Sequence, residues 1–295
     1  MWFAKLGRVD TLEKKQKAVQ KICLASFSPT GNVLAVGRLL AASLARALGL
    51  DATEAVSYWN LSRPGVRRQD LEVDPDTLLI LGVPVYAGRV PNKLLPDLQQ
   101  HLQGQGGPAV GYVCFGNRAF DDGLSELVME LQQHDFSVVG ASAWVTQHAF
   151  APVLGQGRPD EADMAEMRQF GTAVAERIRS GKSMELPQEE AGYGHTPPGP
   201  YYTPLQEDGT PAKFLKAKPK TLLDRCDGCG RCVRACPTGA IDPATCIQVP
   251  GTCIKCQACV ALCPRQAKYF DDPGFLSHKI MLEKTHLEPK RNRWF

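Results

Sequence analysis

The cysteines of this 295-residue chain are unevenly placed, because nine of the eleven lie between Cys226 and Cys263. Eight of these nine form two runs with the spacing C-x2-C-x2-C-x3-C-P, and the second run starts 27 residues after the first. Thiolates three residues apart can wrap one face of a cubane of iron and sulfide, while amides of the tight loop point at its sulfurs. The two runs therefore predict two [4Fe–4S] clusters in one small folding unit.

The fourth cysteine of each run is predicted to bind the cluster of the other run, as in two-cluster ferredoxins. The first cluster would then be held by Cys226, Cys229, Cys232 and Cys263, and the second by Cys253, Cys256, Cys259 and Cys236. Zinc and a disulfide scaffold are the alternatives. Structural zinc usually takes paired C-x2-C knuckles, and a reducing cytosol disfavours disulfides. The ninth cysteine, Cys246, lies outside the pattern and is expected to be a packed thiol.

A second site is predicted where an apolar run, residues 22–27, ends in a polar loop before a helical pattern. The loop reads Ser26-Phe-Ser-Pro-Thr-Gly-Asn32. Hydroxyls, a glycine and the first amides of a helix can hold a phosphate dianion without Lys or Arg. The loop lacks the Gly-Lys-Ser/Thr of a nucleotide P-loop and the G-x-G-x-x-G of a dinucleotide loop. An ordinary strand-to-helix turn is the alternative.

Two further loops follow later apolar runs. Residues 82–91 (GVPVYAGRVP) follow one run, and residues 115–122 (FGNRAFDD) follow another. Because the carboxyl ends of parallel strands meet at one edge of a sheet, all three loops are expected to lie together there.

The first loop resembles the FMN-phosphate loop of flavodoxins, which has the same S/T-x-T-G-N core. Residues 82–91, 115–122, 147–150 (QHAF) and 157–160 (GRPD) resemble a specific family over residues 21–270. That family consists of flavodoxin domains fused to two-cluster ferredoxins, and it is typical of anaerobic bacteria and archaea.

The resemblance implies FMN as a third cofactor and a set of residues around it. The phosphate would be held by Ser26, Ser28, Thr30, Gly31 and Asn32. The flavin ring would be bordered by Pro84, Val85, Tyr86, Ala87, Gly88, Phe115, Gly116, Asn117 and Arg118. Within this set, Tyr86 could stack on the ring, and Asn117 and Arg118 would meet its pyrimidine edge or other face. His148 and Tyr86 are candidate proton donors, with a purely structural histidine as the alternative for His148.

Alternating patterns predict an α/β fold for the first part of the chain. Strands are expected at 22–27, 55–59, 77–83, 109–115 and 137–145, and helices at 33–48, 91–102, 123–133 and 160–178. Strands alternating with helices indicate a parallel sheet covered on both faces. We therefore expect a flavodoxin-like, doubly wound, five-stranded parallel sheet, followed by a small α+β ferredoxin-like unit.

Composition shifts suggest five segments. They are an N-terminal extension (1–20), the FMN-binding domain (21–181), a Pro-rich linker (182–221), the ferredoxin-like unit (222–270) and a C-terminal tail (271–295). No apolar run reaches the roughly 18 residues that a membrane span needs. The first 21 residues hold six Lys or Arg but no apolar core of a secretion signal. A cytoplasmic location is therefore expected.

The cofactors predict electron transfer between one-electron carriers and FMN. A net charge of +3 is too small to indicate nucleic-acid binding. The expected partners are a ferredoxin, a flavodoxin or a reductase or acceptor enzyme. Basic residues that could attract an acidic carrier are Lys213, Lys216, Lys218, Lys220, Lys290, Arg291 and Arg293. One alternative is a ferredoxin-dependent reductase that turns over a substrate at FMN, and another is a redox sensor. Neither the partner nor the oligomeric state follows from the sequence.

Overall fold

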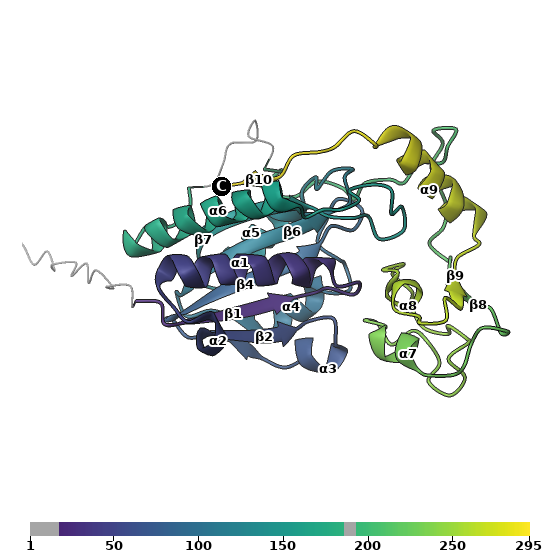
Figure 1. Cartoon of the computed structure of the whole chain (residues 1–295), viewed down its shortest axis with the longest axis horizontal. Helices are drawn as coiled ribbons and strands as arrows, with labels where there is room; N and C mark the ends of the chain where they lie inside the picture. The colour runs from purple at the N-terminus through teal and green to yellow at the C-terminus, as the bar shows by residue number, and fades with distance from the viewer. Residues whose placement is uncertain (1–17, 186–192) are drawn as a thin grey trace, which may run out of the picture.

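The computed structural model describes residues 18–185 and 193–295 and contains a six-stranded sheet (Figure 1). Most of the expected N-terminal extension, residues 1–17, lies outside the described residues. The sheet order is β10-β7-β6-β4-β1-β2. Its strands are β1 (Lys21–Ser26), β2 (Val56–Asn60), β4 (Thr77–Pro84), β6 (Pro108–Phe115), β7 (Ser137–Val145) and β10 (Arg293–Trp294).

The five long strands pair in parallel, and in chain order they stand as 2-1-3-4-5. This is the strand order of flavodoxin-like doubly wound sheets. The predicted parallel sheet is therefore confirmed, with each predicted strand displaced by at most one residue at either end. Strands β4 and β6 are buried along almost their whole length, as expected for strands covered on both faces.

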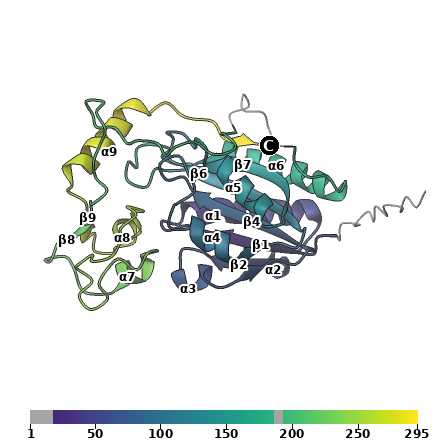
Figure 2. The ribbon, with the colours of Figure 1, turned by 180° about the vertical axis from the view of Figure 1, so that it is seen from behind.

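Helices cover both faces of the sheet (Figures 1 and 2). One face carries α1 (Asn32–Leu48) and α6 (Glu161–Arg179), and the other carries α4 (Leu95–His101) and α5 (Gly123–Gln133). Shorter elements lie between them: α2 (Ala52–Ala55), α3 (Pro64–Arg67), and the strand pair β3 (Leu71–Glu72) and β5 (Leu102–Gln103). The helix expected over 91–102 begins only at Leu95, because residues 91–94 form turns.

The cysteine-rich region lies beside the carboxyl ends of the parallel strands (Figure 1). It contains β8 (Lys220–Thr221), α7 (Arg231–Ala235), α8 (Ala258–Ala261) and β9 (Lys268–Tyr269), with β8 and β9 paired antiparallel. The expected α+β unit is thus present, at the edge of the sheet where the three predicted flavin loops end. Among the described residues, no helix has the length and apolar character to cross a membrane.

The last residues of the chain return to the first domain. Helix α9 (Pro273–Thr285) follows the cysteine-rich region, and β10 then pairs antiparallel with β7 through Arg293–Ala143 and Trp294–Ser142. The structure therefore adds a sixth strand to the five that were predicted. Its two residues are too few to give a periodic signal in the sequence.

Candidate functional site

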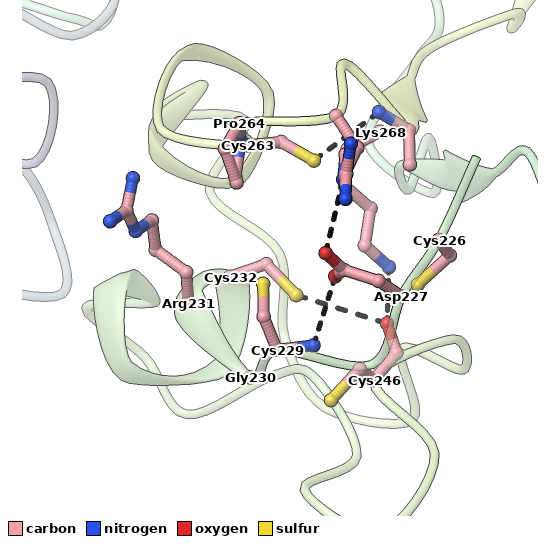
Figure 3. A pocket seen from close by; sticks show the side chains of 12 residues that line it. Cys226, Asp227, Cys229, Gly230, Arg231, Cys232, Cys246, Cys263, Pro264 and Lys268 are labelled. Atoms are coloured by element: carbon pink, nitrogen blue, oxygen red, sulfur yellow. Dashed lines mark hydrogen bonds and ion pairs between the residues drawn. The ribbon is translucent and has the colours of Figure 1, made fainter.

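The four cysteines predicted for the first cluster line one cavity (Figure 3). Its empty volume is about 310 Å³. Cys226, Cys229 and Cys232 reach it from the loop before α7 and from α7 itself, and Cys263 reaches it from the end of α8. The predicted partner from the second run is therefore at this cavity. Cys246, expected to be a packed thiol, is buried and also lines it.

The four cysteines predicted for the second cluster line another cavity, with an empty volume of about 330 Å³. Cys253, Cys256 and Cys259 come from the second run, and Cys236 comes from the first. The two cavities have matching hydrogen bonds, because Ala240 N donates to Cys236 Sγ and Ala267 N to Cys263 Sγ, each at 3.2 Å. The sequence repeat is therefore also a structural repeat. We call the cavities cavity 1 and cavity 2, and the clusters they would hold cluster 1 and cluster 2.

The chemistry of the cavities suits thiolate ligands of iron. Burial raises the pKa of Cys256 and of Cys259 to about 12. Thiols in such surroundings stay protonated unless a metal takes the place of the proton. Within residues 18–185 and 193–295, no group of three or more His, Cys, Asp or Glu side chains is arranged to hold a single ion. The cysteines instead surround the two cavities.

The predicted phosphate loop joins β1 to α1, and part of it is already hydrogen-bonded within the protein. Ser26 is fully buried, and its Oγ lies 3.2 Å from the Tyr58 hydroxyl. Ser28 Oγ accepts a hydrogen bond from Leu34 N at 2.9 Å. The Asn32 side chain donates to Gln147 O at 2.9 Å. These three side chains therefore shape the loop.

Backbone groups are the better candidates to hold a phosphate. In the hydrogen bonds of the described residues, the amides of Thr30, Asn32 and Val33 have no partner. Gly31 has a φ of 99° and caps α1 without a side-chain bond. A Cβ built on Gly31 would meet no atom within 4 Å, so the space above the loop is open. Unpaired amides at a helix N-terminus with open space above them fit a phosphate dianion.

The turn after β4 brings Tyr86 close to cavity 2. Tyr86 and Arg89 exchange backbone hydrogen bonds across a tight turn, with positive φ at Ala87 and Gly88. Burial raises the pKa of the Tyr86 hydroxyl well above its usual range, and the neighbouring Cys256 and Cys253 raise it further. The turn expected to border the flavin ring therefore lies next to two cysteines of cavity 2.

Asn117 has a different position from the one expected beside a flavin ring edge. Its side-chain amide donates to His286 O at 2.6 Å and to Glu288 O at 3.0 Å, and its oxygen accepts from Lys290 N at 2.9 Å. Asn117 is buried and holds the segment between α9 and β10. Its hydrogen-bonding capacity is thus largely used by the returning C-terminal segment, whose path the sequence did not indicate.

The Pro-rich linker covers the same edge of the sheet. The Asp122 carboxylate accepts hydrogen bonds from His195 N and Gly199 N, both at 2.8 Å. Tyr202 N donates to Ala87 O at 2.9 Å, and the Arg118 guanidinium lies 3.9 Å from the centre of the Tyr202 ring. The linker is therefore fixed to the loops expected around the flavin, and Arg118 contacts it directly.

His148 lies behind the loop after β6. Its ring packs so closely on Gly116 that a Cβ there would lie 2.2 Å from a ring carbon. Its Nδ1 accepts from the amides of Phe150 and Ala151 at 3.4 and 3.2 Å. Burial, with nearby His278 and Arg118, lowers the pKa of His148 to about 4. A neutral, half-buried imidazole with these contacts supports a structural role for His148.

Sequence reasoning missed the residues that join the two parts. Arg67 of α3 is buried, forms an ion pair with Asp97 and donates to Pro237 O at 2.8 Å. Pro237 follows the cavity-2 ligand Cys236. Ile254, between Cys253 and Cys256, packs against the core of the first domain. An arginine in a polar loop and an isoleucine in a cysteine run carry no pattern that marks them as contacts.

Comparison with known proteins supports the iron–sulfur assignment. Two family models described as "4Fe-4S binding domain" match residues 220–242 and 250–268. A subunit of the polysulfide reductase of Wolinella succinogenes is 34% identical over 85 residues, which are 24% of this chain and 44% of that protein. The chain thus spans less than half of this relative. The two family matches indicate two [4Fe–4S] clusters.

Solved structures similar to the chain include flavodoxins and a larger oxidoreductase. Rubredoxin oxygen:oxidoreductase from Desulfovibrio gigas has 14% identity and a TM-score of 0.39, over 56% of this chain and 37% of that one. A flavodoxin from Archaea has 11% identity and a TM-score of 0.35, over 54% of this chain and 99% of that one. Two-electron-reduced Megasphaera elsdenii flavodoxin has 16% identity and a TM-score of 0.36, over 52% and 98%.

The flavodoxin-like fold rests on the strand order of the sheet itself. Together with the two 4Fe-4S matches, it gives the chain the architecture of a flavodoxin–ferredoxin fusion.

Proposed function

We propose that this chain is an iron–sulfur flavoprotein that transfers electrons between one-electron carriers and FMN through two [4Fe–4S] clusters. The observation that carries the proposal is the position of Tyr86. It belongs to a turn at the carboxyl end of the sheet, where doubly wound folds bind their ligands. It also lies next to Cys256 and Cys253 of cavity 2. One residue thus links the proposed flavin edge to one proposed cluster.

The residues present fit both kinds of cofactor. The amides of Thr30, Asn32 and Val33 would bind the FMN phosphate, and the eight cysteines of the two cavities would hold the clusters. When bound, the clusters exchange single electrons and FMN exchanges one or two. The protein holds the two sites together through Arg67 and Ile254, which fix cavity 2 against the first domain.

The covered edge favours electron transfer over turnover of a bulky substrate. Tyr202 binds Ala87 O, Arg118 lies against the Tyr202 ring, and Asp122 holds the linker at His195 and Gly199. A linker fixed in this way restricts access to the proposed flavin ring. Electrons need no open pocket to reach FMN, whereas a substrate does. The neutral His148 also gives little support to a proton-donating reductase.

Anaerobic purification followed by cofactor analysis tests the proposal. The account expects about eight iron, about eight acid-labile sulfide and one FMN per chain. The loaded protein is then mixed with a reduced low-potential ferredoxin, NADH or NADPH, and flavin bleaching is followed together with cluster bleaching. Reduction by the ferredoxin and reoxidation by a second carrier support electron transfer. Zinc in place of iron, or the absence of flavin, would overturn the proposal, and flavin that never reoxidises would favour a sensor.

A further inference from the structure

The internal repeat allows the two cavities to be compared position by position. The second run follows the first by 27 residues, so Cys236 corresponds to Cys263 and Ile241 to Lys268. The matching amide-to-sulfur hydrogen bonds of Ala240 and Ala267 show that the correspondence holds in three dimensions. Lys268 lines cavity 1, and Ile241 lines cavity 2. A buried cation on one side therefore faces a buried alkyl group on the other.

Lys268 is held rigidly inside the protein. It is only 3% exposed, whereas a lysine is seldom buried without partners. Its Nζ donates to Thr221 Oγ1 and to Cys246 O, both at 2.6 Å, and lies 3.4 Å from Ile247 O (Figure 3). All three partners are neutral oxygens, so the ammonium charge is not cancelled by a carboxylate. The charge lowers the pKa of the Cys232 thiol, which shows that it acts on a predicted ligand.

The other charges around the cavities favour the same direction. Cavity 1 is also lined by Arg231, Arg265 and Asp227, and the last two form an ion pair at 3.2 Å. The repeat places Ala258, Thr238 and Ile254 at the corresponding positions of cavity 2. Cavity 2 has one lysine.

That lysine, Lys255, is only half-buried, and its Nζ donates to Leu215 O at 2.6 Å and to Cys253 O at 3.3 Å. Water screens its charge more than that of Lys268.

Solvent access adds to this difference. Cys229 of cavity 1 is exposed, whereas Cys256 and Cys259 of cavity 2 are both buried. Reduction adds a negative charge to a cluster, which water and nearby cations stabilise and an apolar environment does not. Both effects make cluster 1 easier to reduce than cluster 2.

We propose that Lys268 separates the two clusters in reduction potential, so that the first electron taken up rests at cluster 1. Cluster 2, beside Tyr86, is then the lower-potential relay to the flavin edge. One electron leaves an external one-electron donor, which is oxidised, and the same electron reduces cluster 1. This inference rests on the two clusters of the proposed function, but it does not require FMN.

A redox titration monitored by electron paramagnetic resonance tests the inference. Wild-type protein should show two one-electron steps, and Cys229→Ser and Cys256→Ser, which each alter one cluster, assign the steps. The step at higher potential should belong to cluster 1. Lys268→Met removes the charge at nearly constant length and should lower that step, with a much smaller effect on the other. Lys216→Met removes an exposed lysine and should shift neither.

Lys268→Met also leaves the oxygens of Thr221 and Cys246 without their donor. If this variant loses its clusters, the mirror variant Ile241→Lys still decides, because it should raise the lower step. The inference is overturned if the higher step belongs to cluster 2. It is also overturned if Lys268→Met shifts both steps equally or neither. A wild-type protein without iron signals would overturn the proposed function as well, whereas a protein with clusters but no FMN would leave this test intact.

Discussion

The Cys256 thiol lies close enough to Tyr86 to raise the pKa of its hydroxyl, although the two residues are 170 positions apart in the chain. Tyr86 comes from the turn after β4, and Cys256 precedes α8. Their proximity puts cavity 2, rather than cavity 1, next to the loops where a doubly wound fold binds its ligand. An electron path from clusters to flavin would therefore have an order, with cluster 2 innermost.

Gly31→Asp should abolish FMN binding while both clusters remain. The new carboxylate would stand at the open space above the unpaired amides, where the phosphate dianion is expected. Its side chain would also strain a backbone with a φ of 99°. Flavin content and iron content of the purified variant give the measurement, and Gly49→Asp serves as a control for strain alone, because Gly49 ends α1 at a φ of 78°. Normal FMN in the Gly31 variant would show that the cofactor binds elsewhere.

Cys236→Ala should damage cluster 2, although Cys236 belongs to the first run. Cys263→Ala should damage cluster 1 for the converse reason, because each of these residues lines the cavity of the other run. Iron and sulfide analysis with cluster spectra of both variants provides the test, and Cys246→Ala is the matched control outside the pattern. Loss of the cluster nearest in sequence would show that the ligand assignment is wrong.

Asn117→Gly should release the segment between α9 and β10. Glycine keeps the positive φ of 65° but removes the side chain that binds three backbone groups. The loss should cost about 2 kcal/mol of stability, since buried partners are left unsatisfied. Amide hydrogen exchange of residues 286–295 should accelerate, while exchange in β4 stays slow. Gln132→Ala, an exposed change on α5, should alter neither, and unchanged exchange in the Asn117 variant would contradict the anchoring role.

Acid should loosen the segment around His148. Its pKa is about 4 in the folded protein and 6.5 in an open chain, so the folded state binds fewer protons between these values. Stability from the neutral ring is therefore present above pH 6.5 and is lost as the pH falls toward 4. Between pH 7 and pH 5, the local opening free energy should fall by about 2 kcal/mol. Exchange of the Phe150 amide, corrected for its intrinsic rate, reports this, and His148→Gln should show no such dependence.

The first domain could be predicted almost element by element. Each long strand is a strongly apolar run and each long helix has a clear helical period, so burial and local pattern agree there. The two cysteine runs could be read equally well, because the spacing required by a cubane leaves few other interpretations. The cross-run pairing around each cavity followed from the same spacing.

Contacts between distant segments could not be predicted. Asn117 looked like a ring-edge residue because its loop does end beside the expected flavin, but the returning C-terminal segment takes its hydrogen bonds. The basic run before the clusters was expected to attract a carrier, yet Lys218 binds Val249 O and Lys220 pairs with Asp271. Such partners come from tertiary packing of chain segments that carry no periodic signal of their own.

The most direct test of the account is the rate at which flavin is reduced through cluster 2. Reduced low-potential ferredoxin is mixed anaerobically with wild-type protein and with Cys256→Ser, a variant that alters a cavity-2 ligand and leaves the phosphate loop unchanged. Cys246→Ser is the control, because it changes a buried cysteine outside the two ligand sets. The account predicts rapid flavin reduction in the wild type and the control, and a much slower phase in Cys256→Ser despite a full complement of FMN. Equal rates in all three proteins would contradict it, because the clusters would then lie outside the path to the flavin.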